Sequence, residues 1–294
     1  HREFFDELQK QLTRTVHVHG DAIRVGVATS GNDHRSRSSA CHYQSDTGDL
    51  MEKHLRAVIN GADLAGYGND EVEVNFGTSK VQPLKARLED RTRTAPFPFY
   101  GNRFQFRAVG SNQNINFPLA ILDTAFAESL DVMAEAIENG TPVRDVVAAT
   151  LKAHLPTIFH GNGYSPEWQT EAAERGLPNL KTSPEAYAEF TSDKNVTLFT
   201  TQNVMTEREL HARREILEEK YVLDIEMEAT CLLRMVETGI LPACAKDLKT
   251  YLEPVFGQDS TEIYKAVDEQ RQVLRTAHAG IAAAKDQPNY VFVR

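Results

Sequence analysis

The sequence predicts an α+β fold, with antiparallel strands in its first part and a largely helical C-terminal part. Before residue 119, short stretches in which polar and apolar residues alternate, as in strands, are mixed with helical patterns. From residue 119 onward, apolar residues recur every three to four positions over long segments, which predicts consecutive helices. We therefore expect residues 1–118 to form an α+β region and residues 119–294 to form the helical part of the same domain.

Composition and charge are those of a soluble globular protein. Of the 294 residues, 41% are hydrophobic and 25% are charged, and no apolar run approaches the roughly 20 residues that span a bilayer. The net charge of −10 argues against a general nucleic-acid binder, which needs a basic face. The three cysteines lack metal-site or redox spacing. We expect a cytoplasmic protein that binds neither nucleic acid nor membrane.

The chain begins with HREFFDELQK, which has neither an initiator methionine nor a basic-then-apolar signal segment. We therefore expect a piece of a longer protein. A targeting segment upstream of His1 would instead direct that protein to an organelle.

The first 35 residues predict a helix, a strand and a turn. Apolar residues recur at helical spacing over residues 2–18, and Gly20 and Asp21 are expected to end that helix. Residues 23–29 alternate and predict a strand, and residues 30–33 predict a turn because Gly, Asn and Asp favour turns.

The next segment, residues 36–50, shows no periodicity and has the composition of a loop, although it is long for a compact domain. Residues 51–60 resume a helical pattern that Gly61 closes. Residues 71–76 alternate acidic and apolar residues, which predicts a short strand.

The C-terminal part predicts a series of helices with recognisable caps. Thr141 is a plausible N-cap, and Thr206 and Glu209 have the spacing of a capping box. The expected helices cover residues 119–137, 141–155, 166–175, 206–238 and 261–284. The apolar face expected for the first of them comprises Leu122, Phe126, Leu130, Met133 and Ile137.

Four arginines, Arg91, Arg93, Arg103 and Arg107, lie within residues 90–114 among aromatic residues, prolines and glycines. Over residues 103–109 the sequence alternates with the period of a strand. One face of that strand would carry Phe104, Phe106 and Ala108, and the other would carry Arg103, Gln105 and Arg107.

Arginines bind carboxylate and phosphate groups because the planar guanidinium matches both and keeps its charge. Arg35, at the exit of the strand expected over residues 23–29, would add a fifth arginine to such a site. The residues alone leave open whether these arginines form an anion site or an ordinary solvated surface. The Gly-Asn-Gly at 161–163 is too weak to indicate a phosphate loop, and no Ser–His–Asp, Cys–His, HExxH or CxxC set is identifiable.

Several motifs, in order along most of the chain, resemble the later catalytic half of type III glutamine synthetases. They are ATSGNDHR at 28–35, DRTRTAPF at 90–97, GNRFQFRAVGS at 101–111, FHGNGYSPEW at 159–168, ELHARREI at 209–216 and IEMEA at 225–229. The resemblance implies part of a glutamine synthetase catalytic domain. It also implies an enzyme that joins ammonium to glutamate, using ATP and Mg²⁺ or Mn²⁺, through γ-glutamyl phosphate. The family forms ring homo-oligomers in which neighbouring subunits complete each active site.

The resemblance also implies residue roles. Arg35 and Arg107 resemble the arginines that bind glutamate. Arg91 and Arg103 match catalytic arginines that hold the ATP phosphates and the phosphoryl group in transfer, and Arg93 is a weaker phosphate-binding match. Gln105 stands where the family has a metal-ligating glutamate. Its amide carries no charge, so weaker metal binding is expected.

Two other departures concern missing segments. The family's front half, with its N-terminal β-grasp domain and other metal carboxylates, has no counterpart in this sequence. Residues 36–50 replace a family stretch that reads EAPPAIIS. Permissible codons for residues 37–45, CGA AGC TCC GCC TGC CAT TAT CAG TCT, encode EAPPAIIS when read one base later. We therefore expect residues 36–50 to be a reading-frame slip.

Three functions remain open at this stage. The first is glutamate–ammonia ligase activity. The second is a catalytically inactive fragment or pseudo-subunit that retains part of the glutamate and ATP site. The third, unrelated to the family, is an anion-binding helical adaptor.

Overall fold

The chain divides into two compact units, His1–Leu217 and Glu218–Arg294. The computed structural model describes residues 2–32, 45–46, 49–62, 71–74, 77, 82, 84–87, 96–98, 105–107, 113–159, 161–163, 165–250 and 260–285. Its helices are α1 (Arg2–Gly26), α2 (Asp49–Ile59), α3 (Asn116–Glu138), α4 (Val143–His154), α5 (Pro166–Glu174), α6 (Ser183–Glu189), α7 (Asp193–Thr201), α8 (Glu207–Met235), α9 (Leu241–Thr250) and α10 (Thr261–Lys285). The expected division at residue 118 stays a prediction.

Helices account for most of the described residues, and the described strands form two short pairs. β1 (Ser45–Asp46) pairs in parallel with β4 (Phe97–Pro98). β2 (Glu71–Val74) pairs antiparallel with β3 (Leu84–Arg87). The strand expected from residue 71 is therefore present, and its antiparallel pairing agrees with the sequence.

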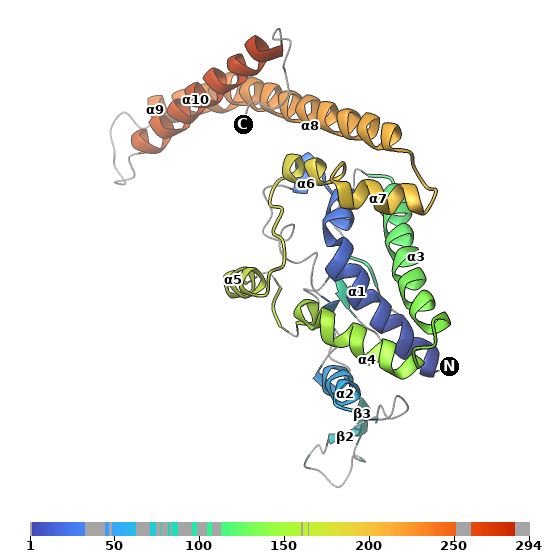
Figure 1. The fold of residues 1–294 in the computed structure, drawn as a ribbon. Helices are drawn as coiled ribbons and strands as arrows, with labels where there is room; N and C mark the ends of the chain where they lie inside the picture. Colours follow the sequence, from blue (N-terminus) through green and yellow to red (C-terminus); the bar gives the residue numbers. More distant parts are fainter. Residues whose placement is uncertain are drawn as a thin grey trace. The chain divides into compact units, whose positions relative to one another are not determined.

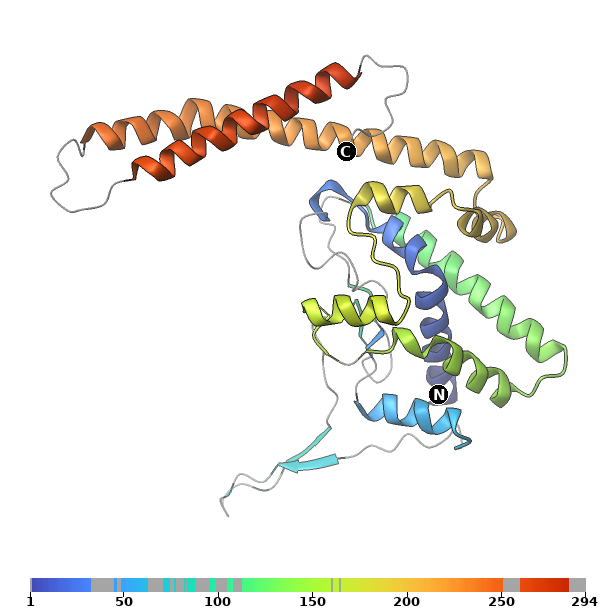
Figure 2. The same ribbon diagram turned by 60° about the vertical axis from the view of Figure 1, so that its left-hand side comes forward.

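In the first unit, α1 packs against α3, α4 and α6 (Figures 1 and 2). This contact encloses an apolar core that also receives β4. The core contains Leu12, Val16, Ile23 and Phe97, with Phe106, Leu122 and Phe126 packed against it. A second cluster joins α2 and α4 and consists of Leu55, Val58, Met133, Val146, Val147, Leu151 and Ile158.

The strand expected over residues 23–29 is wrong, because α1 continues as far as Gly26. Gly20 and Asp21 do not end the helix but follow a kink, where His19 has non-helical angles (φ −116°, ψ 18°). The alternation of polar and apolar residues predicted a strand wrongly because both kinds of residue are buried in this segment. Arg24 lies between two buried apolar residues and is itself fully buried. Its Nε donates to the carbonyl of Leu180 at 3.1 Å. Period-two patterning indicates a strand only when one face meets water.

The helix expected over residues 119–137 is confirmed as α3, but its buried face is rotated from the expected one. The buried residues are Ile121, Thr124, Ala125, Ser129 and Met133, whereas Leu130 and Ile137 are exposed. Several of the buried side chains are small, which lets α3 approach α1 closely. Ser129 is polar and makes hydrogen bonds, so a prediction based on apolar residues alone does not include it in the buried face. Leu122 and Phe126 contact the core from the edge of this face.

Helix ends agree with the sequence in most places. Gly61 has φ +101° just after α2, and Gly176 has φ +76° just after α5, so both occupy a conformation that favours glycine. The N-cap role expected for Thr141 is wrong. Pro142 stands at that position with extended angles, and no side chain caps α4. The backbone N–H of Thr141 instead donates to Ala136 at the end of α3.

The sequence interpretation contained no helices corresponding to α6, α7 and α9. A usable signal existed for α6, because Thr182 and Glu185 form a capping box, with Glu185 N–H donating to Thr182 Oγ1 at 3.4 Å and Thr182 N–H donating to Glu185 at 3.1 Å. α7 docks on the kink of α1, where Lys194 donates to the carbonyl of Val18 at 2.9 Å and pairs with Asp21 at 2.7 Å.

The second unit contains most of α8, a π-helical turn (Val236–Ile240), α9 and α10. The expected capping box at the start of α8 is confirmed, since Thr206 N–H donates to Glu209 at 2.8 Å. Within the unit, α8 and α10 are joined by Thr230 and His278, 3.0 Å apart. The free cysteines of the described residues are Cys231 and Cys244, and Cys41 lies outside them.

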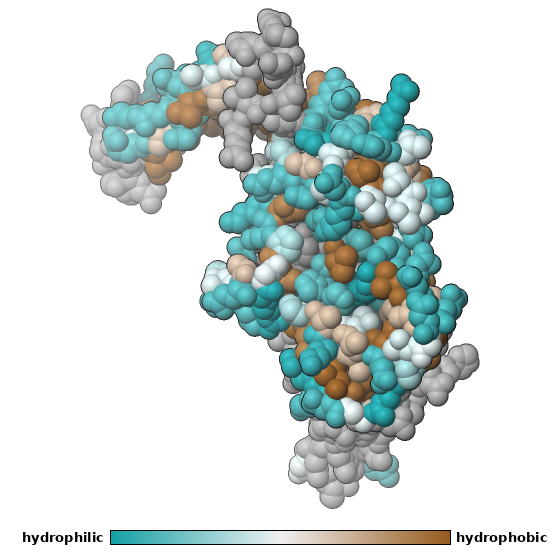
Figure 3. Space-filling view, viewed as in Figure 1, coloured by the Kyte–Doolittle hydropathy of each residue, from teal (hydrophilic) through white to brown (hydrophobic). Residues whose placement is uncertain are grey.

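None of the described helices combines the length and apolar content that a membrane span requires. Hydrophilic residues cover much of the face seen in Figure 3, with apolar residues scattered between them.

Candidate functional site

Two of the predicted site residues, Gln105 and Arg107, lie among the described residues. The other four, Arg35, Arg91, Arg93 and Arg103, lie outside them. The structure therefore reports on one short part of the expected arginine-rich wall.

Residues 105–107 are not assigned to a strand, so the strand expected there is not found, but two backbone hydrogen bonds join them to residues 96–98. The backbone N–H of Gln105 donates to the carbonyl of Pro98 at 3.2 Å, and that of Arg107 donates to Pro96 at 2.8 Å. Phe106 consequently lies opposite Phe97, and their rings stack with centroids 4.8 Å apart.

The expected alternation holds at these three residues. Phe106 packs against the core cluster, while Gln105 and Arg107 share the other side and are joined by a hydrogen bond. Nη2 of Arg107 donates to Oε1 of Gln105 at 3.2 Å. An amide oxygen and a guanidinium thus lie together, half-buried, on the face that the family resemblance assigns to ligand binding.

The surroundings of Gln105 favour weak binding of a divalent cation, as expected from the sequence. The Gln105 oxygen brings no negative charge and already accepts a hydrogen bond from a cation, whereas Mg²⁺ and Ca²⁺ favour carboxylate oxygens. Within the part of the chain that the structure describes, no group of three or more His, Cys, Asp or Glu residues could hold a metal ion.

A second polar arrangement, between α1 and α3, is one that the sequence interpretation missed. The α1–α3 polar cluster consists of Arg14, Thr15, His19, Glu128 and Ser129. Arg14 donates to both carboxylate oxygens of Glu128, at 2.5 and 2.9 Å. Nε2 of His19 lies 2.8 Å from the same carboxylate. The hydroxyl of Ser129 accepts from Arg14 at 2.7 Å and from Thr15 at 2.9 Å.

These contacts determine the charge of Glu128. Burial raises the pKa of its carboxyl, but hydrogen bonds from His19 and Arg14 and their positive charge lower it more, to about 2. Glu128 is therefore ionised at neutral pH and acts as an acceptor. It binds two α1 side chains to α3, which is a positioning role rather than proton transfer.

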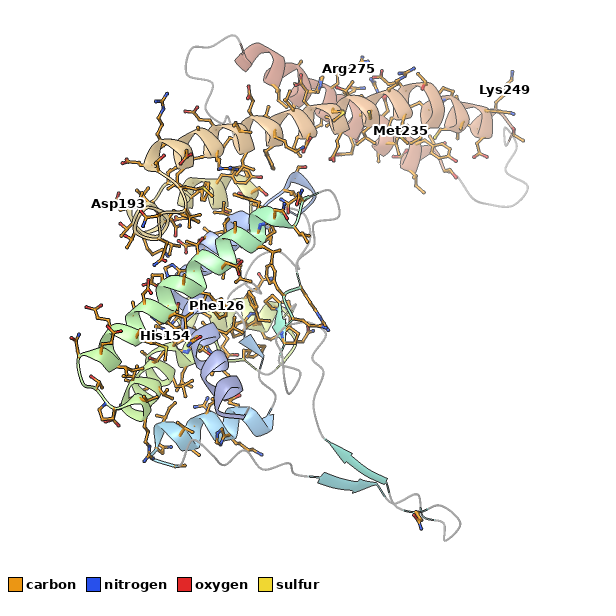
Figure 4. The ribbon with its side chains drawn as sticks, turned by 90° about the vertical axis from the view of Figure 1, so that its right-hand side faces the viewer. Phe126, His154, Asp193, Met235, Lys249 and Arg275 are labelled. Atoms are coloured by element: carbon orange, nitrogen blue, oxygen red, sulfur yellow. The ribbon has the colours of Figure 1, made fainter. Side chains whose placement is uncertain are left out.

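A histidine pair extends this arrangement to α4. The Nδ1 atoms of His17 and His154 are 2.8 Å apart, and the rings meet edge to face. Figure 4 labels His154. Burial lowers the pKa of His17. Burial, the neighbouring His17 and Arg14 lower the pKa of His154 to about 4. Both rings are neutral at pH 7, and one donates to the other.

The signal that could have found this arrangement lies in α1 itself. Arg14, His17 and His19 lie within residues 11–26 of α1, all of which are buried or half-buried, and side chains that carry charge are seldom found in such places. Their partners on α3 and α4 are distant in sequence, so no local pattern links them.

Comparison with known proteins supports the resemblance seen in the motifs. Residues 142–256 match the glutamine synthetase C-terminal domain. The chain is 37% identical over 254 residues to the type-3 glutamine synthetase of Dictyostelium discoideum, covering 83% of this chain and 34% of that protein. The chain is similar to type-3 glutamine synthetase.

Two bacterial glutamine synthetases are also similar. That of Bacteroides fragilis is 26% identical over 291 residues, covering 92% of this chain and 39% of the relative. That of Butyrivibrio fibrisolvens is 32% identical over 245 residues, covering 77% and 33%. The chain thus spans between 33% and 39% of the length of these glutamine synthetases.

Proposed function

We propose that the chain is part of a glutamine synthetase, which joins ammonium to glutamate with ATP through γ-glutamyl phosphate. The similarity to type-3 glutamine synthetase over 254 residues is the observation that carries this proposal. The arrangement of Gln105 and Arg107 on the face opposite the core supports it, since a binding wall must present its polar groups away from the core.

In this proposal Arg107 and Arg35 bind the carboxylates of glutamate. Arg91 and Arg103, with Arg93, bind the phosphates of ATP and the phosphoryl group in transfer. Phosphoryl transfer is catalysed mainly by positioning and by neutralising charge on the equatorial oxygens, and arginines supply both. The guanidinium of Arg107 is held by its bond to Gln105, which limits its orientations before glutamate arrives.

The whole enzyme would also use Mg²⁺ or Mn²⁺, held by the carboxylates of the family's front half. Gln105 would contribute no charge to that site. We further propose that the whole protein has an α+β catalytic domain, assembles as a ring homo-oligomer and resides in the cytoplasm.

A second function is favoured by a specific observation. Gln105, a neutral amide, stands where the family resemblance implies a carboxylate that binds metal. The glutamate-binding arginine, Arg107, is present and is hydrogen-bonded to this amide. The chain would then be a pseudo-subunit that binds glutamate without catalysing its amidation.

Two measurements on the purified chain test the proposal and separate its two forms. L-Glutamate binding is measured by calorimetry, and metal-dependent γ-glutamyl hydroxamate formation is measured with ATP present. We expect binding without hydroxamate formation, which supports the pseudo-subunit. Hydroxamate formation would instead support the active ligase, and absence of glutamate binding would contradict both forms.

A further inference from the structure

The last helix, α10, is joined to the other helices of the second unit by polar side chains. It crosses α8 (Figures 1 and 2), and Nε2 of His278 on α10 lies 3.0 Å from Oγ1 of Thr230 on α8. Oη of Tyr264, near the start of α10, donates to Asp247 of α9 at 2.9 Å. These contacts depend on direction and not on buried apolar area.

A further polar contact is centred on Glu237. Its Oε1 accepts from Nη1 of Arg271 at 3.0 Å and also from Nη2 of Arg275, which is labelled in Figure 4. The two arginines are four residues apart and therefore share one face of α10. Asp268 accepts from Nε of Arg271 at 2.8 Å and helps to orient it. We call Glu237, Arg271 and Arg275 the α10 latch.

The carboxylate of the latch lies in an unusual part of the backbone. Glu237 belongs to the π-helical turn, Val236–Ile240, between α8 and α9. Turns of this kind are rare and are often found at functional sites. A single side chain in this turn thus ties the middle of α10 to the junction between α8 and α9.

The second unit buries little apolar surface that could hold α10 instead. The buried apolar residues of its described part are Leu233 and Val236, each 9% exposed. On α10 itself, Ile263 and Val273 are 65% and 62% exposed, whereas Val16 of α1 in the first unit is fully buried. The hydrophobic effect therefore stabilises the docking of α10 much less than that of α1.

The latch itself is accessible to solvent. The side chains of Arg271, Glu237 and Arg275 are 14%, 29% and 59% exposed. Ion pairs that meet water stabilise a fold only weakly, and dissolved salt screens them. A helix held in this way can detach at a cost well below that of unfolding the whole chain.

We propose that α10 is a strap that docks on the second unit and detaches from it, and that the α10 latch controls the balance between these two states. At low ionic strength the pairs of Glu237 with Arg271 and Arg275 keep α10 docked. At high ionic strength these pairs weaken and α10 is released. The inference goes beyond the proposed function and does not depend on it, since no residue of the glutamate site takes part.

Hydrogen exchange of the purified chain tests this proposal. It is measured in about 0.1 M and about 1 M NaCl, between which the screening length falls from about 10 Å to about 3 Å. Peptides from residues 261–285 report on α10, and peptides from residues 2–26 provide a reference in the first unit. The measurement is repeated for Glu237→Gln, which removes the charge of the latch and keeps its size. Glu228→Gln, at an exposed position of α8, is the matched control.

We expect exchange in α10 to become roughly twofold to tenfold faster at high salt, as for the loss of two exposed ion pairs, while exchange in α1 changes little. Glu237→Gln should show the faster exchange already at low salt and should lose most of the salt dependence. Glu228→Gln should behave like the unmodified chain.

Three results would overturn the proposal. Exchange in α10 that does not respond to salt would show that ion pairs do not hold the helix. Equal acceleration in α1 and α10 would show that salt destabilises the whole chain and does not release one helix. A salt response that Glu237→Gln leaves unchanged, or that Glu228→Gln removes equally well, would exclude Glu237 as the controlling residue.

Discussion

Two helix contacts in the first unit are built in opposite ways. α1 meets α3 through an apolar core and, beside it, through the α1–α3 polar cluster, in which Arg14 and His19 share the carboxylate of Glu128. α2 meets α4 through aliphatic side chains, including Leu55, Val58 and Leu151, each at most 1% exposed. The first contact depends in part on direction and charge, whereas the second depends on the apolar area removed from water.

The difference indicates in which of the two contacts the stability depends on a single side chain. An aliphatic cluster loses stability in proportion to the atoms removed, because burial is non-directional. A polar cluster loses more when one member is removed, because the remaining charged groups stay buried without their partner. The following substitutions test this contrast, beginning with the largest expected effect.

Glu128→Ala should destabilise the chain most, by about 4 kcal/mol, because it leaves Arg14 and His19 without their shared acceptor. The free energy of unfolding is measured by urea titration. Glu135→Ala, an exposed position on the same helix, serves as the control and should change it by less than ~0.5 kcal/mol. Equal losses from the two substitutions would show that the polar cluster does not hold α1 to α3.

Leu151→Ala should cost about 3 kcal/mol, because Leu151 is fully buried in the α2–α4 cluster and its removal leaves a cavity. The same urea titration measures the loss. Leu130→Ala is the matched control, since that leucine is 44% exposed on α3. A loss for Leu151→Ala no larger than for Leu130→Ala would mean that the aliphatic contact contributes little.

Replacing both charged partners should cost less than replacing one. Arg14→Met combined with Glu128→Leu removes both half-buried charges together and keeps most of the volume, so we expect a loss of only about 1 kcal/mol. No such rescue is expected when a second aliphatic residue is removed beside Leu151. A double variant as unstable as Glu128→Ala would contradict the directional character of the polar contact.

The titratable groups that join α1 to α3 and α4 should also respond to acid, whereas the aliphatic contact should not. The pKa of His154 is about 4 in the folded chain against 6.5 for an ordinary histidine, so the unfolded chain binds more protons between these values. Stability therefore falls as the pH falls from 6.5 towards 4. Glu128, with a pKa of about 2 against 4.5, adds a further loss as the pH falls from 4.5 towards 2.

Urea titrations across this range measure that loss. His154→Gln, which removes one titrating group, should give a flatter dependence of stability on pH between 6.5 and 4. Parallel curves for the unmodified chain and this variant would exclude the histidine pair as the source.

The same contrast explains which parts of the fold could be predicted from sequence. The aliphatic helix over residues 51–60 was predictable, because Leu55 and Val58 both follow the helical period and lie in the core. The buried face of α3 was not, because Ser129 is buried through hydrogen bonds to partners more than a hundred residues away in sequence. The strand expected over residues 23–29 failed for a related reason, since burial of Arg24 removes the contrast between inside and outside.

The candidate site was predictable to a similar extent. Alternation indicated correctly that Gln105 and Arg107 share a face and that Phe106 points to the core. It could not indicate that the two polar side chains bond to each other. That bond depends on side-chain conformation, which the alternation does not specify.

The measurement that most directly tests the proposed glutamate site is the effect of Arg107→Ala on L-glutamate affinity, with Arg56→Ala as control. Arg56 is an exposed α2 arginine paired with Glu52 at 2.7 Å, so its loss removes an equal charge from elsewhere. We expect Arg107→Ala to weaken binding by roughly tenfold to a hundredfold, as for one hydrogen bond to a charged group, and Arg56→Ala to have no effect. Equal affinities for the two variants and the unmodified chain would contradict the assignment of this face as the glutamate-binding wall.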